Sequence, residues 1–241
     1  IHMTIYSASD DTHFMAASLD ILNRNSVQLT LGTNFEEYRD LLAEGRPGHT
    51  IGAPFDPERH ALNEANSVWI VGRDAEGRIM HTQALRLLDL RQSSLGEYLR
   101  HCFKEFPPSG LDIDYERSRY RAGPGAHRIA GRVIYHGEVW MGGAPGQYRG
   151  TGLSCVLGRY AFLVAMQRWS PDHVIGFMPK PVAFKGFAER QGYMHAEPGC
   201  LRWFIRGEDS PLEGFMVYMS NEDIRFMLDM PLRELVAQQA A

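Results

Sequence analysis

The sequence lacks several features that would place it in particular classes of protein. No apolar run approaches the ~20 residues that a helix needs to span a bilayer, and the N-terminus has no apolar signal-peptide core. The three cysteines form neither a disulfide framework nor a CxxC pair, and the ten histidines include no HxxxH or HExxH pair. We therefore expect no membrane association, no metal site and a location in the reducing cytoplasm.

The chain also has little excess of charge of either sign. Lys and Arg number 25 against 29 Asp and Glu, with no basic block, so nucleic-acid binding is not expected. The hydrophobic fraction of 44% is that of a globular protein, and 241 residues favour one domain. We expect a vector scar at residues 1–2, an N-terminal helical extension over 3–25, the main domain over 26–220 and a C-terminal helix over 221–241.

Local patterns predict strands that alternate with helices. The clearest signal is a hairpin, in which two apolar and β-branched runs flank the polar turn Asp74–Gly77. Asn34 and Ser220 stand where helix N-caps are expected, and Gly192 stands where a helix ends. Helices are predicted over 10–25, 34–44, 95–106, 151–169 and 182–191, and strands over 27–31, 67–72, 79–88, 127–141, 173–178, 201–206 and 215–219, with a further strand beginning at 193. Residues 46–65 read as a loop, and 109–125 have no clear pattern. The order indicates a mixed α/β domain of the α+β type whose centre is a βαβ unit.

The strand expected over 127–141 separates its side chains by alternation. One face would carry Ile129, Val133, Tyr135, Val139 and Met141, and the other Arg132, His136, Glu138 and Trp140. The helix expected after it, over 151–169, carries an apolar stripe at helical spacing, which predicts an amphipathic helix.

A glycine-rich turn joins this strand to that helix. Its sequence is Gln147-Tyr148-Arg149-Gly150-Thr151-Gly152-Leu153-Ser154. Glycines let the backbone approach a ligand closely, and the free amides at a helix start attract an anion such as a pyrophosphate. The turn fits neither a Walker A loop nor a dinucleotide fingerprint.

This turn resembles the acyl-CoA pyrophosphate loop of the GNAT superfamily of N-acyltransferases, whose pattern is [Q/R]xxGx[G/A]. Gln147-xx-Gly150-x-Gly152 matches strictly, and Arg149-xx-Gly152-x-Ser154 is a second register that the sequence leaves open. Downstream, the segment Phe187–Tyr193 resembles the end of a helix found in that family. The resemblance is specific only from about residue 135 to 193.

The resemblance implies a single GNAT-like domain with a mixed, mostly antiparallel sheet that splays apart at the βαβ unit, with extra terminal helices. It implies acetyl-CoA or another acyl-CoA as co-substrate and an amine of a small molecule or peptide as acceptor. A homodimer is an expectation by analogy alone. The cofactor residues that it implies are the backbone of Val139, Trp140 and Met141, the loop residues Gln147, Tyr148, Arg149, Gly150, Thr151, Gly152 and Ser154, and the helix residues Phe184 and Phe187.

Acyl transfer to an amine needs a base, because an amine arrives mostly as ammonium. Glu138 and His136 are the candidates, since the expected strand would end beside the thioester. A partly buried carboxylate holds a proton more readily than one in water, which suits a base near neutrality. The alternatives are a structural pair between Glu138 and Arg132 and a structural role for His136.

The sequence departs from the family at the usual general acid. The helix tyrosine of the family aligns with Ala188, its asparagine with Pro181, and Phe184 replaces a customary alanine. The departure keeps a non-catalytic acyl-CoA-binding module open. A second alternative is an acyl-homoserine-lactone synthase of the same fold, which Ala84–Leu88 and Phe55-Asp56 faintly resemble.

Overall fold

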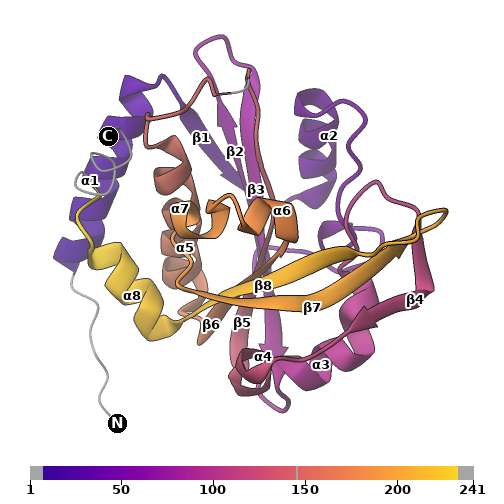
Figure 1. Ribbon diagram of the computed structural model, residues 1–241. Helices are drawn as coiled ribbons and strands as arrows, with labels where there is room; N and C mark the ends of the chain where they lie inside the picture. Colours follow the sequence, from indigo (N-terminus) through magenta and orange to yellow (C-terminus); the bar gives the residue numbers. More distant parts are fainter. Residues whose placement is uncertain (1–7, 145, 233–241) are drawn as a thin grey trace.

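One eight-stranded sheet runs through the molecule and carries helices on both faces, as the computed structural model shows for residues 8–144 and 146–232 (Figure 1). The strand order is β1-β2-β3-β5-β6-β8-β7-β4. The strands are β1 (Gln28–Gly32), β2 (Ser67–Arg73), β3 (Ile79–Leu90), β4 (Ile113–Tyr120), β5 (Gly131–Met141), β6 (His173–Pro179), β7 (His195–Ile205) and β8 (Leu212–Ser220). The helices are α1 (Ala8–Arg24), α2 (Phe35–Gly45), α3 (Leu95–Cys102), α4 (Pro124–Arg128), α5 (Leu153–Trp169), α6 (Lys180–Ala183), α7 (Phe187–Gln191) and α8 (Asn221–Asp229), with 3-10 turns η1 (Ala53–Phe55) and η2 (Phe103–Glu105).

Every strand pair in this sheet is antiparallel except β5 with β6. Helix α5 connects those two parallel strands, so β5-α5-β6 is the expected βαβ unit. The predicted fold class, a mixed and mostly antiparallel α/β domain with additional helices at both ends, is therefore confirmed.

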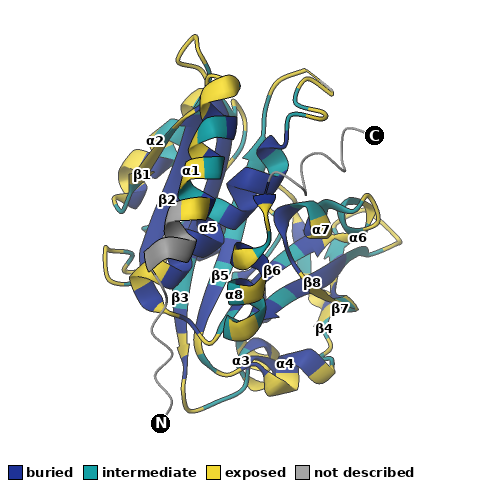
Figure 2. Cartoon of the chain, turned by 90° about the vertical axis from the view of Figure 1, so that its left-hand side faces the viewer, coloured by how far each residue is buried: buried dark blue, intermediate teal, exposed yellow. Residues whose placement is uncertain are grey.

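Helix α5 lies on one face of the sheet beneath α1 and α8. Side chains of all three helices share one apolar core with β3, β5 and β6. Because α1 and α8 cover the side of α5 that faces away from the sheet, α5 is buried nearly all round, and even Arg159 is only 4% exposed (Figure 2). The expectation of an amphipathic α5 is therefore wrong, because other helices cover the side of α5 that would otherwise face solvent.

The opposite face of the sheet carries α2 at one end and α3 with α4 at the other (Figure 1). Phe35, Tyr38 and Leu42 of α2 pack with Trp69 and with Phe55 of η1. A separate apolar cluster joins α3, α4, β5 and β7. Two cores therefore lie side by side on this face, next to the middle strands.

Several local predictions are confirmed. Asn34 accepts the amides of Glu36 and Glu37 as N-cap of α2, and Ser220 forms a capping box with Asp223 at the start of α8. The β2–β3 hairpin turns at Asp74, whose amide donates to Arg78. Gly192 ends α7 with a positive φ of 102°.

Other predicted boundaries are wrong for identifiable reasons. The helix expected over 182–191 is two short helices, because Gly186 adopts a φ of +69° between them. Strand β5 begins at Gly131, since the residues before it form α4. The patternless segment 109–125 contains β4 and the start of α4, and the strand expected from Tyr193 begins at His195.

No helix in the described part of the chain is long and apolar enough to cross a membrane. The vector scar expected at residues 1–2 and the end of the expected C-terminal helix, 233–241, lie outside the described residues.

Candidate active site

Strands β5 and β6 pair for only a short distance and then separate. Their parallel ladder joins Val133–Tyr135 to His173–Ile175. Beyond it, β5 follows β3 to Met141 while β6 follows β8 to Pro179. The edge of β5 beyond Tyr135 therefore has no strand partner on the β6 side, within the ranges that the structure describes.

Gly176 stands at the point of separation, which we call the fork. A Cβ there would lie 3.0 Å from Tyr193 Oη and 3.2 Å from the carbonyl oxygen of His136. A larger side chain would have to displace both groups, so glycine keeps the fork open.

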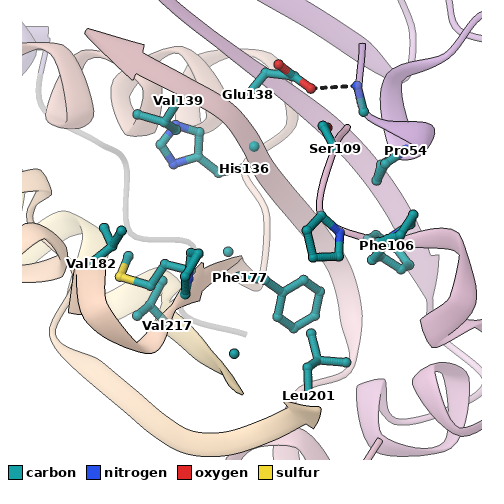
Figure 3. Close-up of a pocket in the computed structure, with 18 of the residues that line it drawn as sticks. Pro54, Phe106, Ser109, His136, Glu138, Val139, Phe177, Val182, Leu201 and Val217 are labelled. Atoms are coloured by element: carbon teal, nitrogen blue, oxygen red, sulfur yellow. Dashed lines mark hydrogen bonds between the residues drawn. The ribbon is translucent and has the colours of Figure 1, made fainter. Parts of the chain in front are cut away.

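A cavity of about 400 Å³ fills the fork and passes through the sheet (Figure 3). On the side of α5 its walls include His136, Val139, Val182, Phe187 and Tyr193, and on the side of α2 they include Arg46, His49, Phe55, Phe106, Tyr135, Glu138 and Phe177. Its volume lies within the range of about 300–1,000 Å³ that is usual for small-ligand sites. The cavity is therefore lined from both faces of the sheet at the fork, where β5 and β6 separate.

His136 and Glu138 do not share a face of β5, which corrects the sequence prediction. Glu138 has a positive φ of 54°, and the register with β3 shifts between Thr82 and Ala84. This β-bulge inserts one extra residue and reverses the alternation beyond it. Figure 3 shows Val139 beside His136, with Glu138 directed elsewhere.

The same bulge moves the other side chains of the strand end. Trp140 joins the core under α2, where the Arg46 guanidinium lies 5.4 Å from its ring centroid. Met141 packs against the α5 core instead of sharing the face of Tyr135. Both side chains are therefore on the faces opposite to those predicted.

His136 belongs to a fully bonded chain of polar groups on the α5 side. Its Nδ1 lies 2.9 Å from Tyr193 Oη and its Nε2 lies 3.0 Å from Gln83 Oε1, while Gln83 Nε2 donates to Leu157 O. Since Gln83 Oε1 can only accept, His136 carries its proton on Nε2 and Tyr193 donates to Nδ1. Burial lowers the pKa of His136 to about 3 and raises that of Tyr193 well above its ordinary value. His136 is therefore a neutral imidazole with both nitrogens engaged.

Glu138 is held on the α2 side by three donors. Its Oε2 accepts from Arg46 Nη1 at 3.1 Å and from His49 Nε2 at 2.8 Å, and its Oε1 accepts from the Gly52 amide at 2.6 Å. Its side chain is 4% exposed, while those of Arg46 and His49 are 17% and 18% exposed. The pair with Arg132, the structural alternative for Glu138, is not formed; Glu138 pairs with Arg46 instead.

Arg46 and His49 are functional candidates that the sequence did not single out. Both lie in the Gly- and Pro-containing segment between α2 and η1, which carries no recognisable pattern. Because the carboxylate of Glu138 can only accept, the neutral form of His49 that fits this contact carries its proton on Nε2 and has Nδ1 as an acceptor. Only the folding of this loop over β5 brings the imidazole to the cavity.

The glycine loop has the conformation that the sequence predicts. Gly150 and Gly152 have φ values of +74° and +79°, and Gly152 is the N-cap of α5. The amides of Gly152 and Ser154 donate to no acceptor among the described residues, whereas that of Leu153 donates to Thr151 Oγ1. The start of this long, buried helix therefore presents free donors together with the positive end of its dipole.

Gln147 and Arg149 differ in what they contact. Gln147 Oε1 accepts the Ala144 amide at 2.9 Å and its Nε2 donates to Tyr148 Oη at 3.3 Å. Arg149 is exposed and forms no ion pair with any described residue. Gln147 thus braces the loop, and Arg149 is the side chain left to meet an anion.

The remaining predicted residues divide between the cavity and the surface. Phe187 lines the cavity, while Phe184 is 70% exposed and packs edge-on against Phe215 at 5.5 Å. Ala188 is buried and offers no hydroxyl. No group of three His, Cys, Asp or Glu side chains able to hold a metal occurs within residues 8–144 and 146–232.

Among known proteins, only solved structures resemble this chain in the comparisons made. No family model matches the chain, and no curated protein matches it. Solved structures that resemble it include an N-acetyltransferase from Staphylococcus aureus Mu50 (TM-score 0.42, 10% identity, 81% of this chain and 98% of that one). A second is the spermidine/spermine N-acetyltransferase SpeG from Vibrio cholerae (TM-score 0.42, 13% identity, 83% of this chain and 96% of that one). A third is Arabidopsis thaliana NAA60 in complex with acetyl-CoA (TM-score 0.45, 11% identity, 80% of this chain and 98% of that one).

The first two are described as N-acetyltransferases, and the third was solved with acetyl-CoA bound. At these TM-scores the likenesses carry no argument about activity, which has to rest on the fork, the cavity and the loop of this chain.

Proposed function

We propose that the protein is an acyl-CoA-dependent N-acyltransferase that moves an acyl group, acetyl in the simplest case, to an amine. The observation that carries the proposal is the fork: a parallel strand pair opens after three residue pairs onto a cavity that crosses the sheet. An open strand edge needs hydrogen-bond partners, and a cavity that reaches both faces lets two substrates meet from opposite sides.

Acetyl-CoA or another acyl-CoA would bind on the α5 side of the fork. The pantetheine amides would pair with the free edge of β5 at Val139–Met141, beside Phe187. The pyrophosphate would lie over residues 147–154, where the amides of Gly152 and Ser154 are free and Arg149 is exposed. Phe184 stays a predicted contact at the rim of this region.

The amine would enter from the α2 side, where His49 and Glu138 meet. We assign the proton acceptor to His49 Nδ1 and an orienting role to Glu138, whose own lone pairs are largely engaged. The amine nitrogen attacks the thioester carbon, the new C–N bond forms and the C–S bond breaks. The ammonium loses one proton to solvent before it attacks, and the second proton of the nitrogen passes to His49 Nδ1 as the amide forms. His136 holds Tyr193 in place and does not act as a base.

CoA would leave as a thiolate that takes its proton from solvent. A thiol has an ordinary pKa of about 8.5, and burial raises the pKa values of Tyr135 and Tyr193, the tyrosines that line the fork, above their usual range. Neither tyrosine is therefore suited to protonate a thiolate. The absence of a hydroxyl at Ala188 is consistent with this route.

The experiment is release of CoA from acetyl-CoA, followed with a thiol reagent over a panel of amines. Turnover with an amine, accompanied by its acetylated product, supports the proposal. Saturable binding of acetyl-CoA without turnover of any amine would favour the non-catalytic module. The alternative is kept because Ala188 stands where the family has its tyrosine. Turnover that requires S-adenosylmethionine as the amine would favour the lactone synthase.

A further inference from the structure

The α2 side of the cavity is built mainly from aromatic rings. Phe55, Phe106 and Phe177 surround Tyr135, with ring centroids 5.5, 4.9 and 5.9 Å from its own, and Phe106 lies 5.7 Å from Phe177. Leu201 closes the wall opposite Glu138 (Figure 3). We call the part of the cavity that these five side chains line the aromatic chamber. At these distances the four rings are in contact and form one aromatic wall, which a flat ring in the cavity could pack against.

The charged groups that line the cavity are already paired. Arg46 and His49 bind Glu138, and Glu213 accepts from Lys180 at 2.7 Å. Glu138 also accepts a backbone amide, so its two oxygens carry three donors. The five side chains of the aromatic chamber include no carboxylate for the additional ammonium groups of a polyamine, and the lining carboxylate Glu213 already carries Lys180 on its Oε2. A polycation would leave its charges in an apolar space, which is costly.

We propose that the acceptor is a primary amine with one aromatic body, an arylalkylamine, whose ring occupies the aromatic chamber and whose nitrogen reaches the fork beside His49. This inference rests on the proposed function. The chamber lies on the face of the sheet opposite to α5 and the glycine loop, so a guest there approaches the thioester from the side that CoA leaves open. Ring burial supplies the affinity, and the single nitrogen needs no second carboxylate.

The test is calorimetric titration of the protein, saturated with CoA, with 2-phenylethylamine and tryptamine and, in parallel, with putrescine and spermidine. Because the ring of an arylalkylamine would be buried in the chamber, we expect these amines to bind about 10- to 100-fold more tightly than either polyamine. Equal or tighter binding of the polyamines would overturn the inference. The inference would also be overturned if neither 2-phenylethylamine nor tryptamine bound.

Titration of the protein with CoA and acetyl-CoA alone separates this inference from the proposed function. If those bind while the arylalkylamines do not, only the acceptor class is wrong; if they do not bind, the proposed function fails as well. A third series uses butyryl-CoA and hexanoyl-CoA. If these bind at least tenfold more tightly than acetyl-CoA while arylalkylamines compete with their acyl chain or fail to bind, the chamber holds the acyl group, and the inference is wrong.

Two variants locate the ring. Phe177→Ala enlarges the chamber and is expected to weaken 2-phenylethylamine binding at least tenfold with the CoA affinity unchanged. Ser109→Trp fills the exposed mouth of the cavity without touching a core, and is expected to abolish amine binding while CoA still binds. Phe226→Ala, at a ring that is 59% exposed on α8, is the matched control and should change neither affinity. Amine binding that survives Ser109→Trp unchanged would contradict the placement.

Discussion

Glu138 occupies a left-handed backbone conformation that non-glycine residues rarely adopt, with φ at 54°. Such a conformation costs on the order of 1–3 kcal/mol and persists only where the surroundings enforce it. Here the Thr82 hydroxyl donates to the carbonyl of Glu138, and Arg46, His49 and the Gly52 amide hold its carboxylate. The strain therefore positions one carboxylate on the α2 side of the fork, next to an imidazole.

At the residue scale we expect His49→Gln to lower kcat by about 10²–10⁴, the usual contribution of a positioned proton acceptor. Glutamine keeps a donor for Glu138 but cannot take the proton of the amine. The affinity for acetyl-CoA should be unchanged, because His49 lies on the other side of the sheet. Steady-state kinetics with the best amine of the panel, together with calorimetry, measure both quantities.

His60→Gln is the matched control, because His60 lies after η1 within the same 46–65 segment and does not line the cavity. It should leave kcat within about twofold of the wild type. A His49→Gln variant with wild-type kcat at saturating substrates would remove His49 from the proton transfer.

Among the helices, α5 is the one at whose start we propose that the pyrophosphate binds. Ser154 lies in its first turn with a free amide. We expect Ser154→Glu to weaken CoA binding at least tenfold, because a carboxylate would repel the pyrophosphate. The same carboxylate favours the helix by about 0.3–1 kcal/mol through the dipole, so the Tm should stay the same or rise.

Ser154→Gln, which has the same size without the charge, serves as the comparison in calorimetry and thermal unfolding. Its CoA affinity should remain well above that of Ser154→Glu. If the two variants bind CoA equally, charge at this helix start does not matter, and the pyrophosphate lies elsewhere.

The sequence was sufficient for the elements whose signals are local. Gly150 and Gly152 predicted the turn before α5, and Asn34 and Ser220 predicted two caps, because a few neighbouring residues decide those conformations. The bulge at Glu138 could not be foreseen, since strict alternation is also what an unbulged strand shows. The one extra residue of the bulge places each later side chain of β5 on the face opposite to the one predicted.

The site depended still more on long-range packing. His49 is separated from Glu138 by 89 positions, and nothing in its neighbourhood distinguishes it from the other histidines. The buried α5 shows the same limit, because its covering by α1 and α8 is a property of the whole fold. Local pattern located the turn where we propose that the pyrophosphate binds, and only the tertiary structure brought His49 to Glu138 and assembled the chamber.

At the scale of the whole molecule, buried neutral histidines couple stability to pH. Burial lowers the pKa of His81 to about 4 and that of His136 to about 3, against about 6.5 in an unfolded chain. The unfolded state takes up protons first as the pH falls, so this stabilisation is complete above about pH 6.5 and is lost towards pH 4 and 3. We expect the free energy of unfolding to fall by about 1.4 kcal/mol per pH unit for each of the two histidines between pH 6 and 4.5.

Urea denaturation at pH 7.5, 6 and 5 measures this slope. His81→Leu should reduce this slope by the contribution of one histidine, about 1.4 kcal/mol per pH unit. Replacement of the exposed His101 by Gln should leave the slope unchanged. A slope that is the same in all three proteins would show that His81 does not remain neutral in the folded state.

The central claim is that acyl-CoA binds along the free edge of β5 with its phosphates at the start of α5. Hydrogen exchange by mass spectrometry, with and without acetyl-CoA, tests it directly. We expect saturable protection of the peptides covering 136–142 and 147–156, with no change in β1 at the sheet's far edge. Unchanged exchange in both peptides up to about 1 mM acetyl-CoA, the upper end of common KM values, would contradict it.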